Sequence, residues 1–328
     1  MLSWISRACK VSPRLWKRFP DASLYRAMTH KEAVDLFSSN DLIGIGIEAD
    51  KVRQKLHPQS VVTYAVEGEF DLAHAGNVAV ACERAERLRA LGASSVSLRG
   101  MLPSEADVNM LATLVQVLTH AGIGVTGFSP HQCAGLAQKG NLPLESTMAQ
   151  LRDAGLQSIN SDPVDTRNEQ SAGLWREAHK AAHKAGMKTS ARVEFGTGDT
   201  ATQRLNALES VARLQDETGG FVSLSVTFRE GAAEEPTAVE YLKSLAVARL
   251  YLPGILNCEN SWRGAGLKVC QLGLRFGSND LGCIEVIDSP VDHRSLTGVT
   301  AGELRRLIRD AGFLPKERTT DYSAYFLT

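Results

Sequence analysis

The sequence predicts an α/β protein built as a (β/α) TIM-type barrel, and three observations support this fold class. Short runs rich in β-branched residues alternate with longer helical patterns from residue 30 onward. Five helical patterns end at a glycine that is followed at once by the next strand: Gly92, Gly122, Gly155, Gly186 and Gly312. About 270 residues follow position 57, close to the usual size of such a barrel. A doubly wound open sheet is the alternative, but no GxGxxG follows the first strand.

Eight segments are predicted to be strands, each short and rich in branched or aromatic residues. They are Val61–Val66, Ser95–Arg99, Gly122–Phe128, Leu156–Ile159, Met187–Phe195, Phe221–Phe228, Ile255–Cys258 and Cys283–Asp288. Helices are predicted at Asn77–Leu91, Ser104–Ala121, Leu144–Ala154, Asn168–Ala185, Ala201–Glu217, Pro236–Leu252 and Thr300–Ala311. A barrel places its ligand site at the C-terminal ends of its strands.

Residues 1–57 are predicted to form an N-terminal helical extension, and residues 58–328 the barrel. Two helices, His30–Ser38 and Asp41–Leu56, are expected to pack against the barrel as a lid or plug. The first nineteen residues carry five cations and no acidic residue, and the cations interrupt the apolar positions, which argues against a secretory signal. This segment predicts either a short helix docked on the body or a weak peripheral contact with a membrane.

Composition excludes several classes of protein. The chain has 36 Lys and Arg against 37 Asp and Glu, so no overall field attracts it to nucleic acid. No apolar run reaches the roughly 18 residues of a transmembrane helix. The six cysteines are scattered, with no metal-ligand spacing, which predicts no metal site and a reducing cytoplasm as the compartment.

Two helix-associated motifs have competing interpretations. His179 and His183 lie four residues apart and could share a metal, but Lys180 stands where a zinc hydrolase has glutamate. A solvated or capping role is therefore preferred. The segment Gly196–Asp199 could cradle a phosphate, or Asp199 or Thr200 could simply cap the next helix.

The segment 275–288 (RFGSNDLGCIEVID) is expected at the mouth of the last strand, where a barrel enzyme binds its substrate. Asn279 and Asp280 could equally build a turn. The segment 261–266 (SWRGAG) is either a helix start with a packed indole or a wall of the site presenting an aromatic face.

An ordered set of motifs between Lys31 and Tyr325 closely resembles one family. The motifs include HPQSVVTY at 57–64, FSPHQ at 128–132, LRDAGLQSI at 151–159, AHKAGMKTSARVEFG at 182–196, SWRGAGLKVCQLGLRFGSNDLG at 261–282 and LRRLIRDAGFLPKER at 304–318. The family is that of the radical S-adenosylmethionine enzymes that include dehypoxanthine futalosine cyclase and aminofutalosine synthase of menaquinone biosynthesis, together with the related subunits that make the deazaflavin chromophore. The resemblance implies a barrel of the radical-SAM kind.

The chain departs from this family where the chemistry starts. The family holds a [4Fe-4S] cluster with a CxxxCxxC triad after the first strand, and the corresponding stretch here, TYAVEGEFDLAHAGNVAVACERAERL, contains only Cys82. Gln132 stands where the resemblance predicts a glutamate, and 160–163 (NSDP) replaces a glycine-rich stretch. By contrast, the motif containing Trp262, Arg275, Asn279 and Asp280 is nearly intact.

The resemblance and its gaps predict a cluster-free homologue, for which no iron–sulfur cluster is expected and S-adenosylmethionine binding stays open, at Ser129 and Gln132. Such a protein would bind a nucleoside-like or related metabolite, or pair with an active radical SAM homologue. Trp262, Arg275, Asn279 and Arg192 are the candidate substrate-binding residues. The alternatives are a non-radical barrel enzyme, with Glu194, Arg192 and Asp162 as acid/base candidates at strand ends, and a still active futalosine-pathway enzyme. Asp280, Glu285 and Glu194 are the candidate catalytic residues. Convergence of Arg192, Glu194 and Glu285 on an open cavity would favour the enzyme. A structural Arg192–Glu194 ion pair is the simpler expectation.

Overall fold

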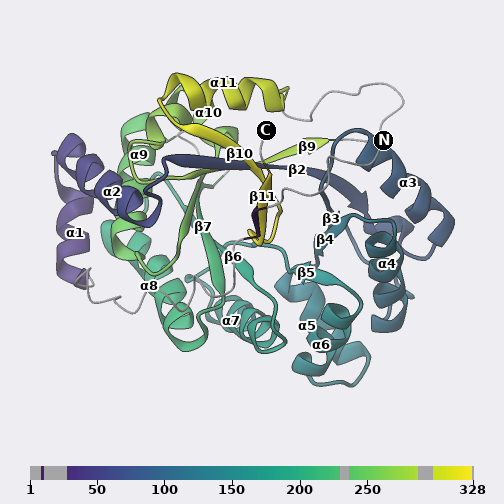
Figure 1. Ribbon diagram of the computed structural model, residues 1–328. Helices are drawn as coiled ribbons and strands as arrows, with labels where there is room; N and C mark the ends of the chain where they lie inside the picture. The colour runs from purple at the N-terminus through teal and green to yellow at the C-terminus, as the bar shows by residue number, and fades with distance from the viewer. Residues whose placement is uncertain (1–8, 11–27, 230–235, 287–297, 327–328) are drawn as a thin grey trace.

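The computed structural model describes residues 9–10, 28–229, 236–286 and 298–326. Eight parallel strands form a nearly closed barrel surrounded by helices (Figure 1). They are β2 (Val61–Asp71), β3 (Ser95–Arg99), β4 (Gly124–Gly127), β5 (Leu156–Ser158), β6 (Thr189–Phe195), β7 (Phe221–Phe228), β8 (Asn257–Asn260) and β9 (Asp280–Val286). β9 pairs with β2, and between β5 and β6 a single parallel bridge joins Pro163 to Arg192. The predicted fold class is confirmed.

The helices that cover the strands follow the predicted order. They are α3 (Val78–Ala90), α4 (Val108–His120), α5 (Pro130–Lys139), α6 (Leu144–Asp153), α7 (Glu169–Lys184), α8 (Ala201–Thr218), α9 (Ala238–Tyr251), α10 (Trp262–Gly273) and α11 (Ala301–Asp310). The five glycines predicted to end helices all have φ between +78° and +114°, a range that only glycine adopts readily. The prediction that these five glycines end helices is therefore confirmed.

Two further α-helices were not among the predicted helix ranges, although a helix start at 261–266 was one of two interpretations. α5 begins at the capping box of Ser129 and Gln132, with Pro130 in its first turn, which is a start signal that was present in the sequence. α10 begins at the N-cap Ser261, so the helix-start interpretation of this segment is confirmed. Both helices are short, which makes their periodicity weak.

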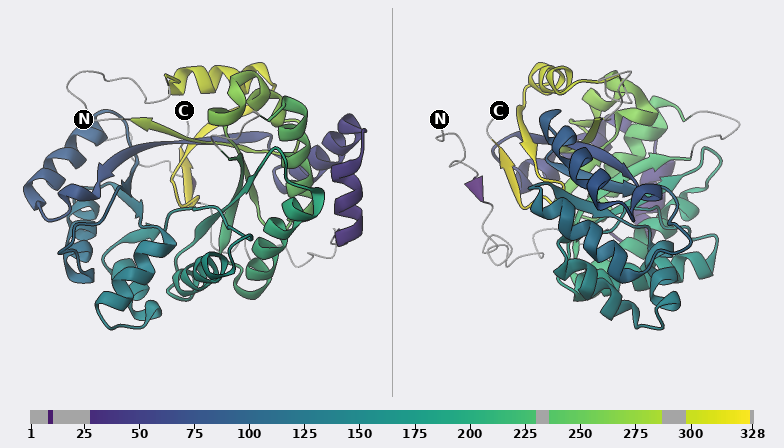
Figure 2. Two further views of the ribbon diagram at one scale, coloured as in Figure 1. Left: turned by 180° about the vertical axis from the view of Figure 1, so that it is seen from behind. Right: turned by 90° about the vertical axis from the view of Figure 1, so that its right-hand side faces the viewer.

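The C-terminal end of the chain runs beneath the barrel. β10 (Leu314–Arg318) pairs in parallel with the start of β2, and β11 (Ala324–Phe326) returns antiparallel to it and also pairs with β1 (Cys9–Lys10). Figure 1 shows β11 across the centre of the ring, and the right-hand view of Figure 2 shows β10 and β11 at one end of the barrel. Thr320 forms a hydrogen bond with Ser95 at the first residue of β3, and Tyr322 lies beside the beginnings of β5 and β7. The amino-terminal end of the barrel is thus closed by the chain's own end.

The alternation of side chains along β6 explains why the barrel interior is polar. Ala191, Val193 and Phe195 point outward and are fully buried against the surrounding helices. Ser190, Arg192 and Glu194 alternate with them, point inward and stay partly exposed. Because successive side chains of a strand face opposite sides, one strand supplies both the apolar shell and the polar lining.

The helices α1 (His30–Ser38) and α2 (Leu42–Leu56) precede the barrel, as predicted, but not as a lid or plug. α1 packs against α8 and α9, and α2 packs against α9, so both lie outside the ring (Figure 1). None of their residues lines the interior cavity. Among the helices of the described residues, none has the length and apolar character needed to cross a bilayer.

Candidate functional site

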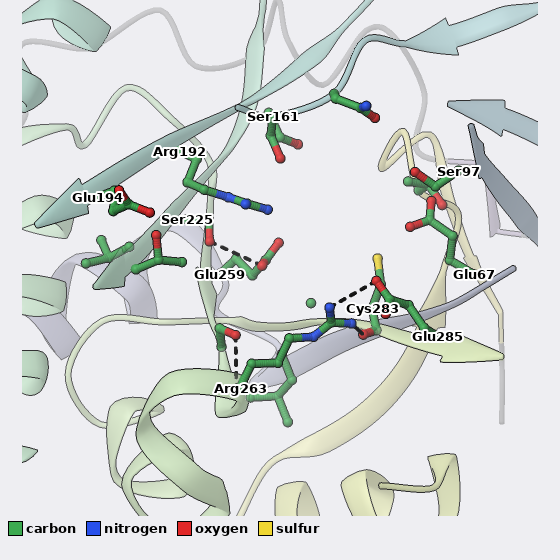
Figure 3. A pocket seen from close by; sticks show the side chains of 18 of the residues that line it. Glu67, Ser97, Ser161, Arg192, Glu194, Ser225, Glu259, Arg263, Cys283 and Glu285 are labelled. Carbon is green, nitrogen blue, oxygen red and sulfur yellow. Dashed lines mark hydrogen bonds and ion pairs between the residues drawn. The ribbon is translucent and has the colours of Figure 1, made fainter. Parts of the chain in front are cut away.

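A polar cavity of about 630 Å³ occupies the barrel interior (Figure 3). Its charged lining consists of Arg99, Arg192, Arg229, Arg263, Arg318, Glu67, Glu194, Glu259 and Glu285. Serine and threonine side chains from β3, β4, β6 and β7 fill the spaces between these groups. The volume falls in the range of small-molecule sites, but the lining is far more polar than usual for them.

Glu285, near the end of β9, forms ion pairs with two arginines. Its Oε1 lies 3.0 Å from a terminal nitrogen of Arg99 on β3 and 3.0 Å from Nη1 of Arg263 at the start of α10. Arg263 also donates to the carbonyl oxygen of Cys283. The carboxylate is nearly buried, so this triad is held firmly across three elements, and Glu285 is committed to the two guanidinium groups.

Glu67 is buried and Glu259 is partly buried, and neither carboxyl group has an arginine at ion-pair distance among the described residues. Burial raises the pKa of both side chains, and Glu67 accepts a hydrogen bond of 3.2 Å from Thr126. Ser225 donates a bond of 3.2 Å to Glu259. Carboxyl groups whose protonated form is favoured can donate a hydrogen bond or a proton to a bound molecule.

Arg192 and Glu194 do not form the expected structural ion pair. Glu194 instead lies 3.7 Å from Nε of Arg229, which also approaches Asp199. Arg192 extends into the cavity in Figure 3. The convergence of Arg192, Glu194 and Glu285 on one cavity is observed. This is the arrangement that favours a ligand-processing site over an apolar interface.

Asp280 is fully buried beneath the cavity and does not line it. Both of its oxygens bind Arg318 of β10, with Nη2 2.8 Å from Oδ1, and Thr63 also donates to it. The Arg318 guanidinium stacks 3.8 Å from the centre of the Tyr322 ring. Asp280 therefore fixes the floor of the barrel.

The segment before β9 lies at the amino-terminal end of the barrel, so its predicted place at the mouth is wrong. β9 starts at Asp280, and everything before that residue precedes the strand. Asn279 accepts bonds from Arg249 and from the backbone of Cys258, and Arg275 donates to the Ala311 carbonyl and lies over the Phe313 ring. Neither Asn279 nor Arg275 lines the cavity. The direction of the strand, which the motif alone does not give, decides this placement.

Trp262 satisfies both of its interpretations in part. Its indole is 6% exposed and packs with the apolar cluster between β2 and α11, yet one side of it borders the cavity. Ser129 and Gln132, the candidate cofactor contacts, cap α5 reciprocally, and Gln132 also donates to the Gly100 carbonyl. Neither of these two residues lines the cavity.

The helix motifs prove structural. His179 is fully buried, so the solvated alternative of the predicted solvated or capping role is wrong for this residue, and both His179 and His183 bond to the hydroxyl of Thr189. Burial lowers the pKa of His179 to about 3 and that of His183 to about 4, which keeps both neutral. Thr200 is the N-cap of α8, as one interpretation of that segment held.

Sequence reasoning missed Glu67, Arg99, Glu259 and Arg263 as cavity residues. Each is a charged residue inside or directly after a predicted strand or turn. A charged side chain in a strand that is otherwise buried on both faces is a signal for the barrel interior, because the outer face is covered by helices.

The thiols do not fit the iron–sulfur cluster that the fold family implies. Among the described residues, Cys283 is the cysteine that lines the cavity, whereas Cys133, Cys258 and Cys270 are buried and Cys82 is exposed on α3. Burial raises the pKa of the Cys283 thiol, opposite to what a thiolate ligand requires. No three His, Cys, Asp or Glu side chains of the described residues group as metal ligands. A cluster needs several convergent thiolates.

Comparisons with known proteins show which proteins the chain resembles in sequence. Residues 223–327 match the CofH/MqnC C-terminal region. The chain is 31% identical over 269 residues to a 5-amino-6-(D-ribitylamino)uracil–L-tyrosine 4-hydroxyphenyl transferase of Methanopyrus kandleri, covering 73% of this chain and 72% of the relative. It is 24% identical over 335 residues to the cyclic dehypoxanthine futalosine synthase of Halalkalibacterium halodurans, covering 90% of each.

A solved structure agrees on the fold. The crystal structure of methylornithine synthase superposes with a TM-score of 0.65 at 18% identity, covering 88% of this chain and 94% of that one. At this identity the likeness concerns the barrel alone. Together with the sequence matches, it shows that the chain belongs to the radical S-adenosylmethionine family that contains the CofH and MqnC enzymes.

Proposed function

We propose that this chain is a cluster-free member of its family that binds a small polar metabolite inside the barrel. The observation that carries the proposal is the cavity itself, whose lining combines five arginines, four glutamates and many hydroxyl groups with a single described cysteine. Such a lining suits a hydroxylated, charged molecule. Three thiolates cannot be gathered around one point from these residues.

The names of the relatives support a hydroxylated ligand. They act on ribitylaminouracil with L-tyrosine or form a futalosine derivative, by their names. A nucleoside-like or related metabolite is therefore the class of ligand that we propose here. The partner role, in which this chain pairs with an active radical SAM homologue, stays a prediction, as does a cytoplasmic location.

Reconstitution with iron tests the first half of the proposal. The purified chain is incubated anaerobically with iron and sulfide, and its iron content and absorbance are measured beside a family member that has the cysteine triad. We expect the iron bound to this chain to stay at background. About four irons per chain with a brown absorbance band would show that a cluster forms and that the proposal is wrong.

A thermal-shift screen tests ligand binding. S-adenosylmethionine, futalosine derivatives and chorismate-derived acids are each added to the intact chain. A ligand present at a hundred times its dissociation constant stabilises the fold by about 2.7 kcal/mol, which is a measurable rise in Tm. A ligand of this kind should lose its effect when Glu259→Gln or Ser225→Ala alters the cavity wall.

A non-radical enzyme is the second candidate, because two carboxyl groups of raised pKa, Glu67 and Glu259, face the same cavity. Groups of this kind serve as general acids. Once a ligand is found, conversion of that ligand by the wild type and its loss in Glu67→Gln would favour an enzyme. If the ligand is recovered unchanged after long incubation, the result argues against an enzyme and supports a binding role.

A further inference from the structure

Arg192 differs from the other arginines of the cavity because no carboxylate pairs with it among the described residues. Four of the five cavity arginines are neutralised at ion-pair distance: Arg99 and Arg263 by Glu285, Arg229 by Glu194, and Arg318 by Asp280. Arg192 has no carboxylate within ion-pair distance among the described residues. Its Nε is buried and has no hydrogen-bond partner there.

The position of Arg192 directs its side chain into the barrel, where the residue stays partly exposed. It lies on β6 at an inward position between Ala191 and Val193, both fully buried on the outer face. Figure 3 shows its side chain extended across the cavity toward Glu259. A guanidinium nitrogen that has lost its water without gaining an acceptor is costly, so Nε needs an acceptor that the described residues do not supply.

The neighbouring strand end contributes two further free polar groups. Asn160 and Ser161 follow β5 directly and line the same cavity, and the bridge from Pro163 to Arg192 holds this segment beside β6. No hydrogen bond to another described residue occupies either side chain. Their amide and hydroxyl donors therefore lie in the same part of the cavity as the Arg192 guanidinium.

Two carboxyl groups near Arg192 limit the kind of ligand. The charge of Arg192 acts on the pKa of Asp162 and of Glu259, whose carboxyl groups are both pushed by burial toward the neutral form. Glu259 is held by Ser225 and can accept a hydroxyl group. An anionic group beside hydroxyl groups satisfies all of these partners, whereas a cationic ligand would face the unneutralised arginine.

We propose that Arg192, with Asn160 and Ser161, forms an oxyanion subsite that binds a carboxylate or phosphate of a hydroxylated metabolite. The planar guanidinium can donate two parallel hydrogen bonds to either group. This inference rests on the proposed function, since it names the chemical class of the ligand that the barrel takes. It also assigns to Arg192 the role of selecting for negative charge.

Matched pairs of probes test the charge requirement. D-gluconate is compared with D-glucitol, and D-ribose 5-phosphate with D-ribose, by thermal shift and calorimetry on the intact chain at millimolar concentration. We expect at least one anionic member to raise Tm and its neutral counterpart to leave Tm unchanged. The two pairs separate a carboxylate from a phosphate preference.

Variants assign the effect to the subsite. Arg192→Gln should weaken binding of the anionic probe about tenfold or more, since a charged hydrogen-bonding partner is lost, and Arg192→Lys should retain part of the affinity. Arg176→Gln, which removes an exposed arginine on α7, is the control for charge and should bind as the wild type does. Apo melting curves of each variant show that it is folded.

Three results would overturn the subsite: equal binding of charged and neutral members, equal affinity in wild type and Arg192→Gln, or no response to either anion. None of them depends on the iron assay. A neutral nucleoside that stabilises the chain while both anions fail would leave the proposed function standing and refute the subsite. A reconstituted cluster would refute the proposed function whatever the anions do.

Discussion

Two of the five arginines that line the barrel cavity, Arg318 and Arg192, have surroundings that differ completely. Arg318, on the floor, binds both oxygens of Asp280 and stacks on Tyr322. Arg192, in the upper cavity, has neither an ion pair nor an acceptor for Nε among the described residues. The barrel therefore neutralises Arg318 with a carboxylate and an aromatic ring, whereas Arg192 keeps an uncompensated charge among the described residues. The difference separates a residue that holds the structure from one that is available to a ligand.

The largest effect is expected when the floor pair is broken. Asp280→Asn leaves the Arg318 guanidinium buried without its counter-charge, which costs about 3–5 kcal/mol of stability. Urea denaturation of wild type and variant measures the change. Asp310→Asn, which breaks the exposed Arg306–Asp310 pair on α11, is the matched control and should cost less than about 0.5 kcal/mol. Equal small losses in both variants would show that the floor pair is not structural.

A smaller effect is expected at Glu285, which is buried between two half-exposed arginines. Glu285→Gln keeps the shape and removes the charge, so that Arg99 and Arg263 turn toward water at a cost of about 1–2 kcal/mol. Urea denaturation again gives the value. High salt should reduce the difference between the two proteins, because the arginines are partly exposed. A loss as large as that of Asp280→Asn would contradict this ranking of the two sites.

Glu67 makes stability depend on pH, and the sign follows from the direction of its shift. Burial raises the pKa of Glu67 above the ordinary 4.5, so the folded chain binds more protons than the unfolded one above that pH. Stability must then fall as the pH rises from 4.5 toward the folded pKa, by up to about 1.4 kcal/mol for each pH unit. Glu67→Gln should remove this part of the dependence. Urea titrations at several pH values would show parallel curves for both proteins if Glu67 did not contribute.

The smallest effect on stability is expected at Arg192. Arg192→Gln removes a guanidinium that has no ion pair in the described chain, so the apo stability should change by less than about 0.5 kcal/mol. The same denaturation measurement decides it. A loss of several kcal/mol would mean that Arg192 has a structural partner and would contradict the distinction drawn between Arg192 and Arg318. The binding loss predicted above and this near-neutral stability together define a ligand residue.

Much of the fold followed from local patterns in the sequence. The bounds of β3 and β7 were predicted to the residue, and the glycines that end five helices were identified from spacing alone. These features depend on neighbours in the chain, so the sequence displays them directly. The strand β10 was not predicted, because its pairing partner, β2, lies some 250 residues away in the sequence. Residues 314–318 show no clear alternation of apolar and polar side chains that would indicate a strand.

The site was predictable only in part. The sequence singled out Arg192, Glu194 and Glu285, and the structure brings them to one cavity. The choice of Arg275, Asn279 and Asp280 rested on a motif whose place at the mouth was assumed. These residues lie before or at the start of β9, at the opposite end of the barrel from the mouth. A motif fixes which residues occur together, but the direction of the strand fixes which end of the barrel they reach.

The sequence by itself determined the class of fold, the order of its elements and the absence of the cysteine triad spacing, because each depends on residues close together in the chain. Only the tertiary structure decided which charges are paired. Arg99 meets Glu285 and Arg318 meets Asp280 across the barrel, while Arg192 meets no described carboxylate. Ion pairing is a matter of distances of a few ångströms between remote segments, and these distances exist only once the barrel has closed.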